Sequence, residues 1–249
     1  MTRGVFVTIS ELLSFLISGM IYASGGNGSP GTRCNKEEKK TMKNEMDMPD
    51  LFAELSRKVI DLMTRTRTAL FELDSCLALR INAEGDLLSR EASKAEGKCN
   101  AELMSGSGII SPDLRFYLVK EAQRCNRLGR IVHQIRNIAT CISEIADKVA
   151  CKDVLAFKPL FLMAEVQLKD AVLSILRKDE ELAFGVRRKD DDLDSLYATE
   201  IENIFRQASD NLFYDFRTGT GLLFILRAIE RIGDHSKQLA VPSFYRLQD

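Results

Sequence analysis

The chain has 249 residues, of which 45% are hydrophobic, so it can bury the core of one domain or of two small ones. A formal net charge of −1 argues against a broad nucleic-acid-binding surface, although local basic patches are compatible with it. There is no tryptophan, and there are only five prolines and fifteen glycines. Because helix breakers are scarce in the periodic segments and strand-like alternation is absent, we predict an all-α protein.

Residues 1–48 do not share the helical pattern of the rest. The apolar segment 5–22 is short and contains Glu11, which argues against a membrane-spanning helix and against direct membrane insertion. Residues 23–32 have the composition of a flexible linker. We predict that 1–48 is disordered or loosely attached, either as a signal peptide or, as we favour, as an over-extended start. In the second case the true first residue would be Met42, Met46 or Met48.

The first half of the remaining chain is predicted to form three helices. The first covers about 49–81, and residues 82–86 bend or interrupt it. The second helix then runs to about Met104. The third begins at Ser111, whose side chain can cap the helix, and ends near Lys148.

The second half repeats this arrangement. Its predicted helices are 157–188, 190–210 and 216–240. Two pairs of motifs align at a spacing of about 105 residues, namely 74–78 with 179–183 and 126–130 with 230–234. A tandem repeat of this kind predicts two three-helix bundles, 49–148 and 157–240, joined near Cys151.

Two pairs of acidic residues recur at a spacing of four in the second half. Glu230 and Asp234 lie one turn apart on the last predicted helix, as Asp190 and Asp194 do on the helix before it. If these helices are antiparallel neighbours, four carboxylates meet, and such oxygen donors suit Mg, Mn, Ca or iron. Asp191 is the expected outer contributor. The alternative is a solvated helix face, with positive charge from Arg227, Arg231 and Lys237.

The first half has no equivalent acids. Asn126 and Arg130 occupy the positions that correspond to Glu230 and Asp234. The positions that correspond to the other acid pair are Gly85 and Ser89, or Asp86 and Arg90 if the register slips by one. A further shift of the third helix offers only Leu128 and Val132. We therefore predict a metal site in the second bundle alone.

The sequence LLFILRAIERIGDHSKQLA at 222–240 resembles the signature helix of PhoU proteins, which carries an E/DxxxD motif matched on the preceding helix. The resemblance is specific over 160–240 and looser over 50–145. Further matching segments are 179–183, Val186 and 190–197. The resemblance implies two three-helix bundles and a bound divalent or trivalent metal, which could be Fe, Mn, Mg or Zn. Members of the family usually carry acids in both halves, so this chain departs from the pattern.

The resemblance also implies a function. PhoU proteins are cytoplasmic negative regulators that link the ATPase of a phosphate transporter to a sensor histidine kinase when phosphate is plentiful. We expect this function here, by protein contact, and a homodimer is compatible with it. One alternative is an accessory subunit of a low-affinity phosphate permease. Another is a divergent bundle without a role in phosphate homeostasis.

The remaining candidate chemistry is sparse. The six cysteines form no CxxC pair and are interpreted as small buried residues. His235 could be a metal ligand, although a helix-face or inter-bundle hydrogen bond is the commoner role, and no role is assigned to His133. No nucleophile elbow or phosphate loop occurs, so we interpret the chain as a non-enzyme. Gly129 and Gly233 recur at equivalent positions, which indicates close helix packing or room beside the carboxylates.

Overall fold

The computed structural model describes residues 36–105, 110–210 and 215–241, and for residues 36–50 and Asp210 it describes the backbone only. Every regular element in these ranges is a helix, which confirms the predicted all-α class. The predictions made for residues 1–35 lie outside the described residues. None of the described helices is both long and apolar enough to cross a membrane.

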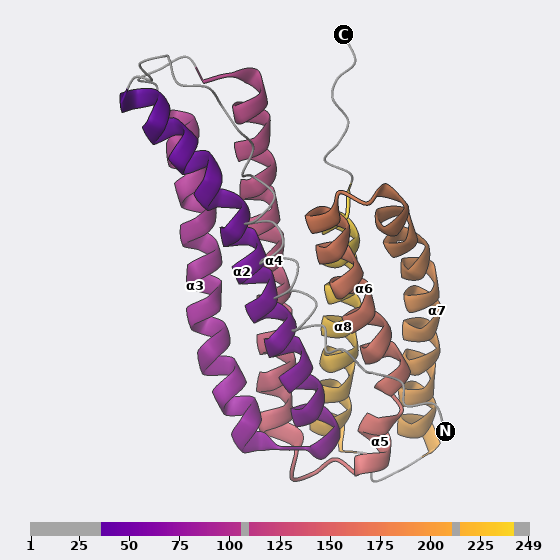
Figure 1. Ribbon diagram of the computed structural model, residues 1–249. Helices are drawn as coiled ribbons and strands as arrows, with labels where there is room; N and C mark the ends of the chain where they lie inside the picture. Colours follow the sequence, from indigo (N-terminus) through magenta and orange to yellow (C-terminus); the bar gives the residue numbers. More distant parts are fainter. Residues whose placement is uncertain (1–35, 106–109, 211–214, 242–249) are drawn as a thin grey trace, which may run out of the picture. The chain divides into compact units, whose positions relative to one another are not determined.

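Three long helices form the first bundle: α2 (Lys36–Glu72), α3 (Ser75–Met104) and α4 (Pro112–Ile145). They lie side by side in Figure 1. Buried residues at helical spacing, among them Val59 and Met63 of α2, face the core. The start predicted at 49 is wrong, because α2 begins at Lys36 and continues through Pro49.

The break between α2 and α3 lies earlier than predicted. Leu73 has a φ of 52°, and the Asp74 side chain accepts a hydrogen bond from the Leu77 N–H at 2.8 Å, which caps α3. The predicted interruption at 82–86 is wrong. Asn82 lies inside α3 and donates from its side-chain amide to Thr140 of α4 at 3.0 Å. The polar and small residues of 82–86 therefore belong to a helix that packs against its neighbour, and they do not form a turn.

The second bundle consists of α6 (Lys158–Arg177), α7 (Glu180–Asp210) and α8 (Phe216–Leu239), preceded by the short helix α5 (Cys151–Leu155). Here too the predicted break, at 188–190, is wrong. The chain turns at Lys178, which has a φ of 54°, and the Asp179 side chain accepts from the Leu182 N–H at 2.9 Å. The two bundles thus repeat the same turn and the same cap.

The two bundles share one continuous hydrophobic core. The pair α4 and α8 packs across their boundary, and a Cβ atom added at Gly221 of α8 would lie 2.8 Å from Cγ2 of Ile145. This close approach needs a glycine, since any side chain would collide with α4. Whether residues 49–148 and 157–240 act as separate domains stays a prediction.

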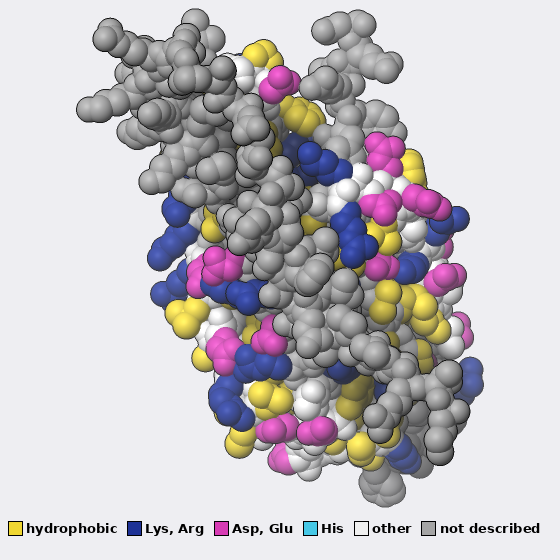
Figure 2. Space-filling model, viewed as in Figure 1, with side chains coloured by type: hydrophobic (Ala, Val, Ile, Leu, Met, Phe, Trp, Pro, Cys, Tyr) yellow, Lys and Arg dark blue, Asp and Glu magenta, His cyan; other side chains and the backbone are white. Residues whose placement is uncertain are grey.

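Charged side chains of both signs are interspersed over the described residues visible in Figure 2. No large basic surface is seen on this face, in keeping with the formal net charge of −1.

Candidate metal centre

The packing of α7 against α8 brings the predicted acids together. Asp190 and Asp194 lie on α7, while Glu230 and Asp234 lie on α8, the neighbouring helix. Loss of water raises the pKa of Asp194, and the negative charges of Asp190 and Asp234 raise this pKa further. Burial likewise raises the pKa of Glu230, with added repulsion from Asp234 and Asp194. The four carboxylates are therefore close enough to sense one another.

Asp190 is the buried member of the cluster. One of its carboxylate oxygens accepts a hydrogen bond from the Gln167 amide of α6 at 3.0 Å, and the other pairs with the Lys237 ammonium of α8. The pKa of Lys237 is raised by its hydrogen bond to Asp190. Lys237 is thus a cation supplied by the chain itself within the acidic cluster.

Two oxygen atoms near the cluster lack donors. Arg227 donates to Oε1 of Glu230 at 3.1 Å, but Oε2 of Glu230 is buried without a hydrogen-bond partner. Oε1 of Gln167 is also buried and unpartnered. A buried acceptor without a partner costs about 1–3 kcal/mol, so these atoms mark a place where a donor or a cation would be stabilising.

Gly233 makes room for the groups around Asp190. A Cβ atom at this position would lie 2.1 Å from Cδ2 of Leu193 and 3.0 Å from Oε1 of Gln167. Close helix packing therefore explains this glycine. The equivalent Gly129 is less restricted, because a Cβ there would meet only Ala92, at 3.4 Å.

The donor set fits a hard cation in its chemistry, since it consists of oxygen atoms. Asp191 is exposed on α7 and acts on the cluster through its charge. Within residues 36–105, 110–210 and 215–241, no three His, Cys, Asp or Glu side chains are grouped so that they could hold a metal ion as they stand. A cation at Asp190 would need Lys237 to release this carboxylate.

The first bundle has a different arrangement at the equivalent place. The Asn126 side chain donates to both carboxylate oxygens of Glu96, each at 3.1 Å, and accepts from Nε of Arg130 at 3.1 Å. The amide therefore links a carboxylate to a guanidinium at the place where α8 of the second bundle carries two acids.

Sequence reasoning found the acids but missed Gln167 and the role of Lys237. From the sequence, Lys237 was one of three cations on a solvated helix face, whereas in the structure its ammonium reaches Asp190 on α7. Gln167 lies 23 residues from its partner, and no local pattern predicts that contact.

The fold and this cluster define a class of helical protein: a tandem of two three-helix bundles with paired acids on the last two helices. Residues 158–241 match the family model described as the PhoU domain. The resemblance to the PhoU family is thereby confirmed, and it extends well beyond the matched domain.

Curated relatives cover most of the chain. A phosphate-specific transport system accessory protein PhoU homolog of Rhizobium meliloti is 27% identical over 185 residues, which are 71% of this chain and 74% of the relative. A protein of the same description from Clostridium acetobutylicum is 25% identical over 213 residues, covering 81% of this chain and 92% of the relative. The crystal structure of PhoU from Pseudomonas aeruginosa superimposes with a TM-score of 0.72 at 18% identity, covering 80% of this chain and 95% of that one. The last comparison concerns the fold alone.

Proposed function

We propose that the chain is a cytoplasmic regulator of phosphate uptake and of phosphate-starvation signalling, and that it acts by protein contact. The observation that carries the proposal is the PhoU domain at 158–241, together with relatives described as accessory proteins of phosphate-specific transport systems. Its partners would be the transporter ATPase and the sensor histidine kinase, and its effect on uptake would be negative. No chemical step on a substrate is part of this function.

The experiment is co-purification from the cell that produces the protein. A tagged full-length chain should recover a phosphate-transporter ATPase or a sensor histidine kinase, and more of it from phosphate-replete cells. Recovery of a phosphate permease without either of these proteins would replace the proposal with the permease-subunit alternative. Recovery of none of the three from replete and starved cells would contradict both.

The proposal includes a metal in the second bundle. Asp190, Asp194, Glu230 and Asp234 would supply oxygen ligands to Fe, Mn, Mg or Zn, with Asp191 as outer contributor. The repulsion among these carboxylates and the unpartnered Oε2 of Glu230 support a cation at this place. The metal would compensate their negative charge and tie α7 to α8.

Elemental analysis of the purified protein tests the metal. The double variant Glu230→Ala/Asp234→Ala should lose essentially all specifically bound metal, while Asn126→Ala/Arg130→Ala, its matched control in the first bundle, should keep it. Lys237→Met should bind metal more tightly than the wild type, because it frees the buried carboxylate of Asp190. Equal metal content in both double variants would show that the acid cluster is not the site.

A further inference from the structure

A polar cavity of about 380 Å³ lies where α3 and α4 of the first bundle meet α8 of the second. It shares no residue with the acid cluster. Its charged lining is cationic in balance: Arg130, Arg136 and Arg231 face it, against a single carboxylate, that of Glu96. Three positive charges line one hollow, and two of them, on Arg130 and Arg231, belong to exposed side chains. Together they favour a negatively charged occupant.

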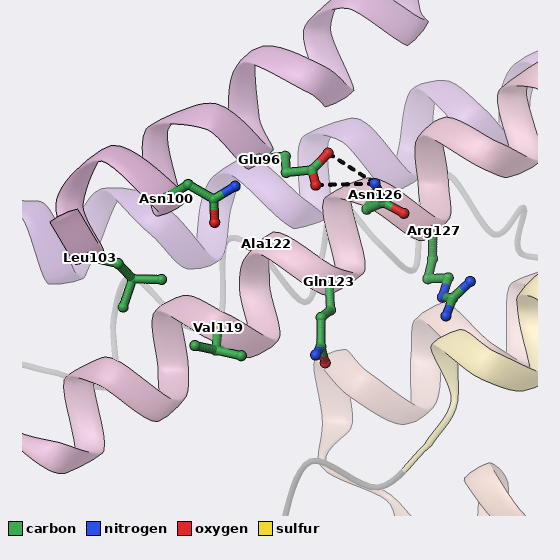
Figure 3. A pocket seen from close by; sticks show the side chains of 8 residues that line it. All are labelled: Glu96, Asn100, Leu103, Val119, Ala122, Gln123, Asn126 and Arg127. Carbon is green, nitrogen blue, oxygen red and sulfur yellow. Dashed lines mark hydrogen bonds between the residues drawn. The ribbon is translucent and has the colours of Figure 1, made fainter.

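The single carboxylate is already engaged. Figure 3 draws a neighbouring pocket that shares Glu96 and Asn126 with this cavity, and it shows the Asn126 amide donating to both carboxylate oxygens of Glu96, at 3.1 Å. Asn126 in turn accepts from Nε of Arg130, which leaves the two terminal nitrogens of that guanidinium for another acceptor. The negative charge of Glu96 is therefore turned toward an amide and not toward the arginines.

The three arginines differ in their partners. Arg136 is held by Asn82, at 3.1 Å, and by an ion pair with Asp86 at 3.2 Å, so its charge is partly compensated. Arg231 forms no hydrogen bond or ion pair with the described part of the chain. Arg130 and Arg231 approach the cavity from different bundles, α4 and α8 respectively.

Two buried polar atoms in the lining have no partner. Nδ1 of His235 lacks a hydrogen bond, although the residue is only 6% exposed, and Oγ of Ser89 is buried without one. The Ser89 hydroxyl can donate to an oxygen acceptor. The ring of His235 already pairs with the Gln238 side chain, and Nδ1 donates in the tautomer that carries the proton on this nitrogen. Since buried polar groups are nearly always hydrogen-bonded, these two donors point to an acceptor that belongs in the cavity.

We propose that this cavity binds a small oxyanion of the phosphate class, held by the guanidinium groups of Arg130 and Arg231 and by the side chains of His235 and Ser89. A tetrahedral oxyanion offers several acceptor oxygens, which suits donors that converge from three helices. The ligand can be free inorganic phosphate or the phosphate group of a small molecule, because the chemistry at the arginines is the same. Cys125 and Gly129 also line the cavity, and neither adds a negative charge to it.

The proposal also accounts for the asymmetry of the repeat. Asn126 and Arg130 stand where the second bundle has Glu230 and Asp234, and both face this cavity. The same two positions of the repeat therefore supply two acids to the acid cluster of the second bundle, and an amide and a cation to this cavity. The binding does not depend on the proposed regulatory function, so either idea can fail alone.

Calorimetry on the full chain at constant ionic strength tests the binding, with inorganic phosphate in one series and AMP in another. Each charge-assisted arginine contact is worth about tenfold in affinity, so the double variant Arg130→Gln/Arg231→Gln should bind about a hundredfold more weakly than the wild type. Arg188→Gln, an exposed arginine on α7, is the matched control and should bind like the wild type. Circular dichroism of each variant checks that it is folded.

The proposal is supported if phosphate or AMP binds the wild type and the control but not the double variant. Which of the two ligands binds identifies the source of the phosphate group. If neither ligand binds the wild type at millimolar concentration, the proposal is wrong. It is equally wrong if the folded double variant binds as tightly as the wild type.

Discussion

Glu230 carries an unfavourable charge when no metal ion is near, although Arg227 pairs with one of its two oxygens. Its pKa in the folded protein is raised above the ordinary value of 4.5, first by burial and then by Asp234. The folded state therefore holds this proton more tightly than the unfolded state does. The resulting stability is present below pH 4.5 and is lost as the pH rises through the folded-state pKa.

We expect Glu230→Gln to stabilise the metal-free protein at pH 7, by about 1 kcal/mol, because it removes the repulsion and the charge on a buried oxygen. Thermal unfolding in chelator at pH 5 and at pH 7 measures this. The gain should be larger at pH 7. Glu202→Gln, an exposed acid on α7, should change the stability little at either pH. A loss of stability in Glu230→Gln at pH 7 would contradict the placement of the repulsive cluster.

The two equivalent glycines give a second residue-scale prediction. Gly233→Ala should destabilise the protein by about 1–3 kcal/mol, since the new methyl group would collide with Leu193 and force this fully buried side chain to shift. Gly129→Ala should be neutral or stabilising by up to about 1 kcal/mol, because alanine favours the helix and only Ala92 lies near. Denaturant unfolding compares the two. Similar changes in both would argue against the tight packing beside Gln167.

At the scale of single helices, the turns between the first two helices of each bundle carry the repeat. Asp74 and Asp179 cap α3 and α7, each after a residue with positive φ. The sequence aligned these two motifs but placed the breaks elsewhere. The breaks predicted at 82–86 and 188–190 followed local composition. In the structure both segments are helical, and contacts between helices, such as that of Asn82 with Thr140, stabilise them.

Replacing either cap should therefore cost stability. Asp74→Ala and Asp179→Ala should each lower the free energy of unfolding by about 1 kcal/mol, because one backbone N–H at the start of the helix loses its acceptor. Asp192→Ala, an exposed aspartate inside α7, is the control and should stay within about 0.5 kcal/mol of the wild type. Urea denaturation gives all three values. If Asp179→Ala is as stable as the control, the cap does not contribute to stability.

At the scale of the molecule, the tandem bundles were predictable because the apolar spacing and the aligned motifs repeat along the chain. Their packing was not. Glu165 of α6 is buried and receives hydrogen bonds from Thr64 at 3.1 Å and Arg67 at 2.7 Å, both on α2, across about 100 residues of sequence. No periodicity encodes such a contact, and the same holds for the cavity between α4 and α8.

The proposed function concerns the whole molecule, and uptake of labelled phosphate by the producing cell tests it most directly. Cells that lack the protein should take up phosphate faster than the wild type when phosphate is plentiful, because the restraint on the transporter is gone. Expression of the intact chain should restore the lower rate. Phosphate uptake that is unchanged by removal of the protein, in replete and in starved cells alike, would contradict the account.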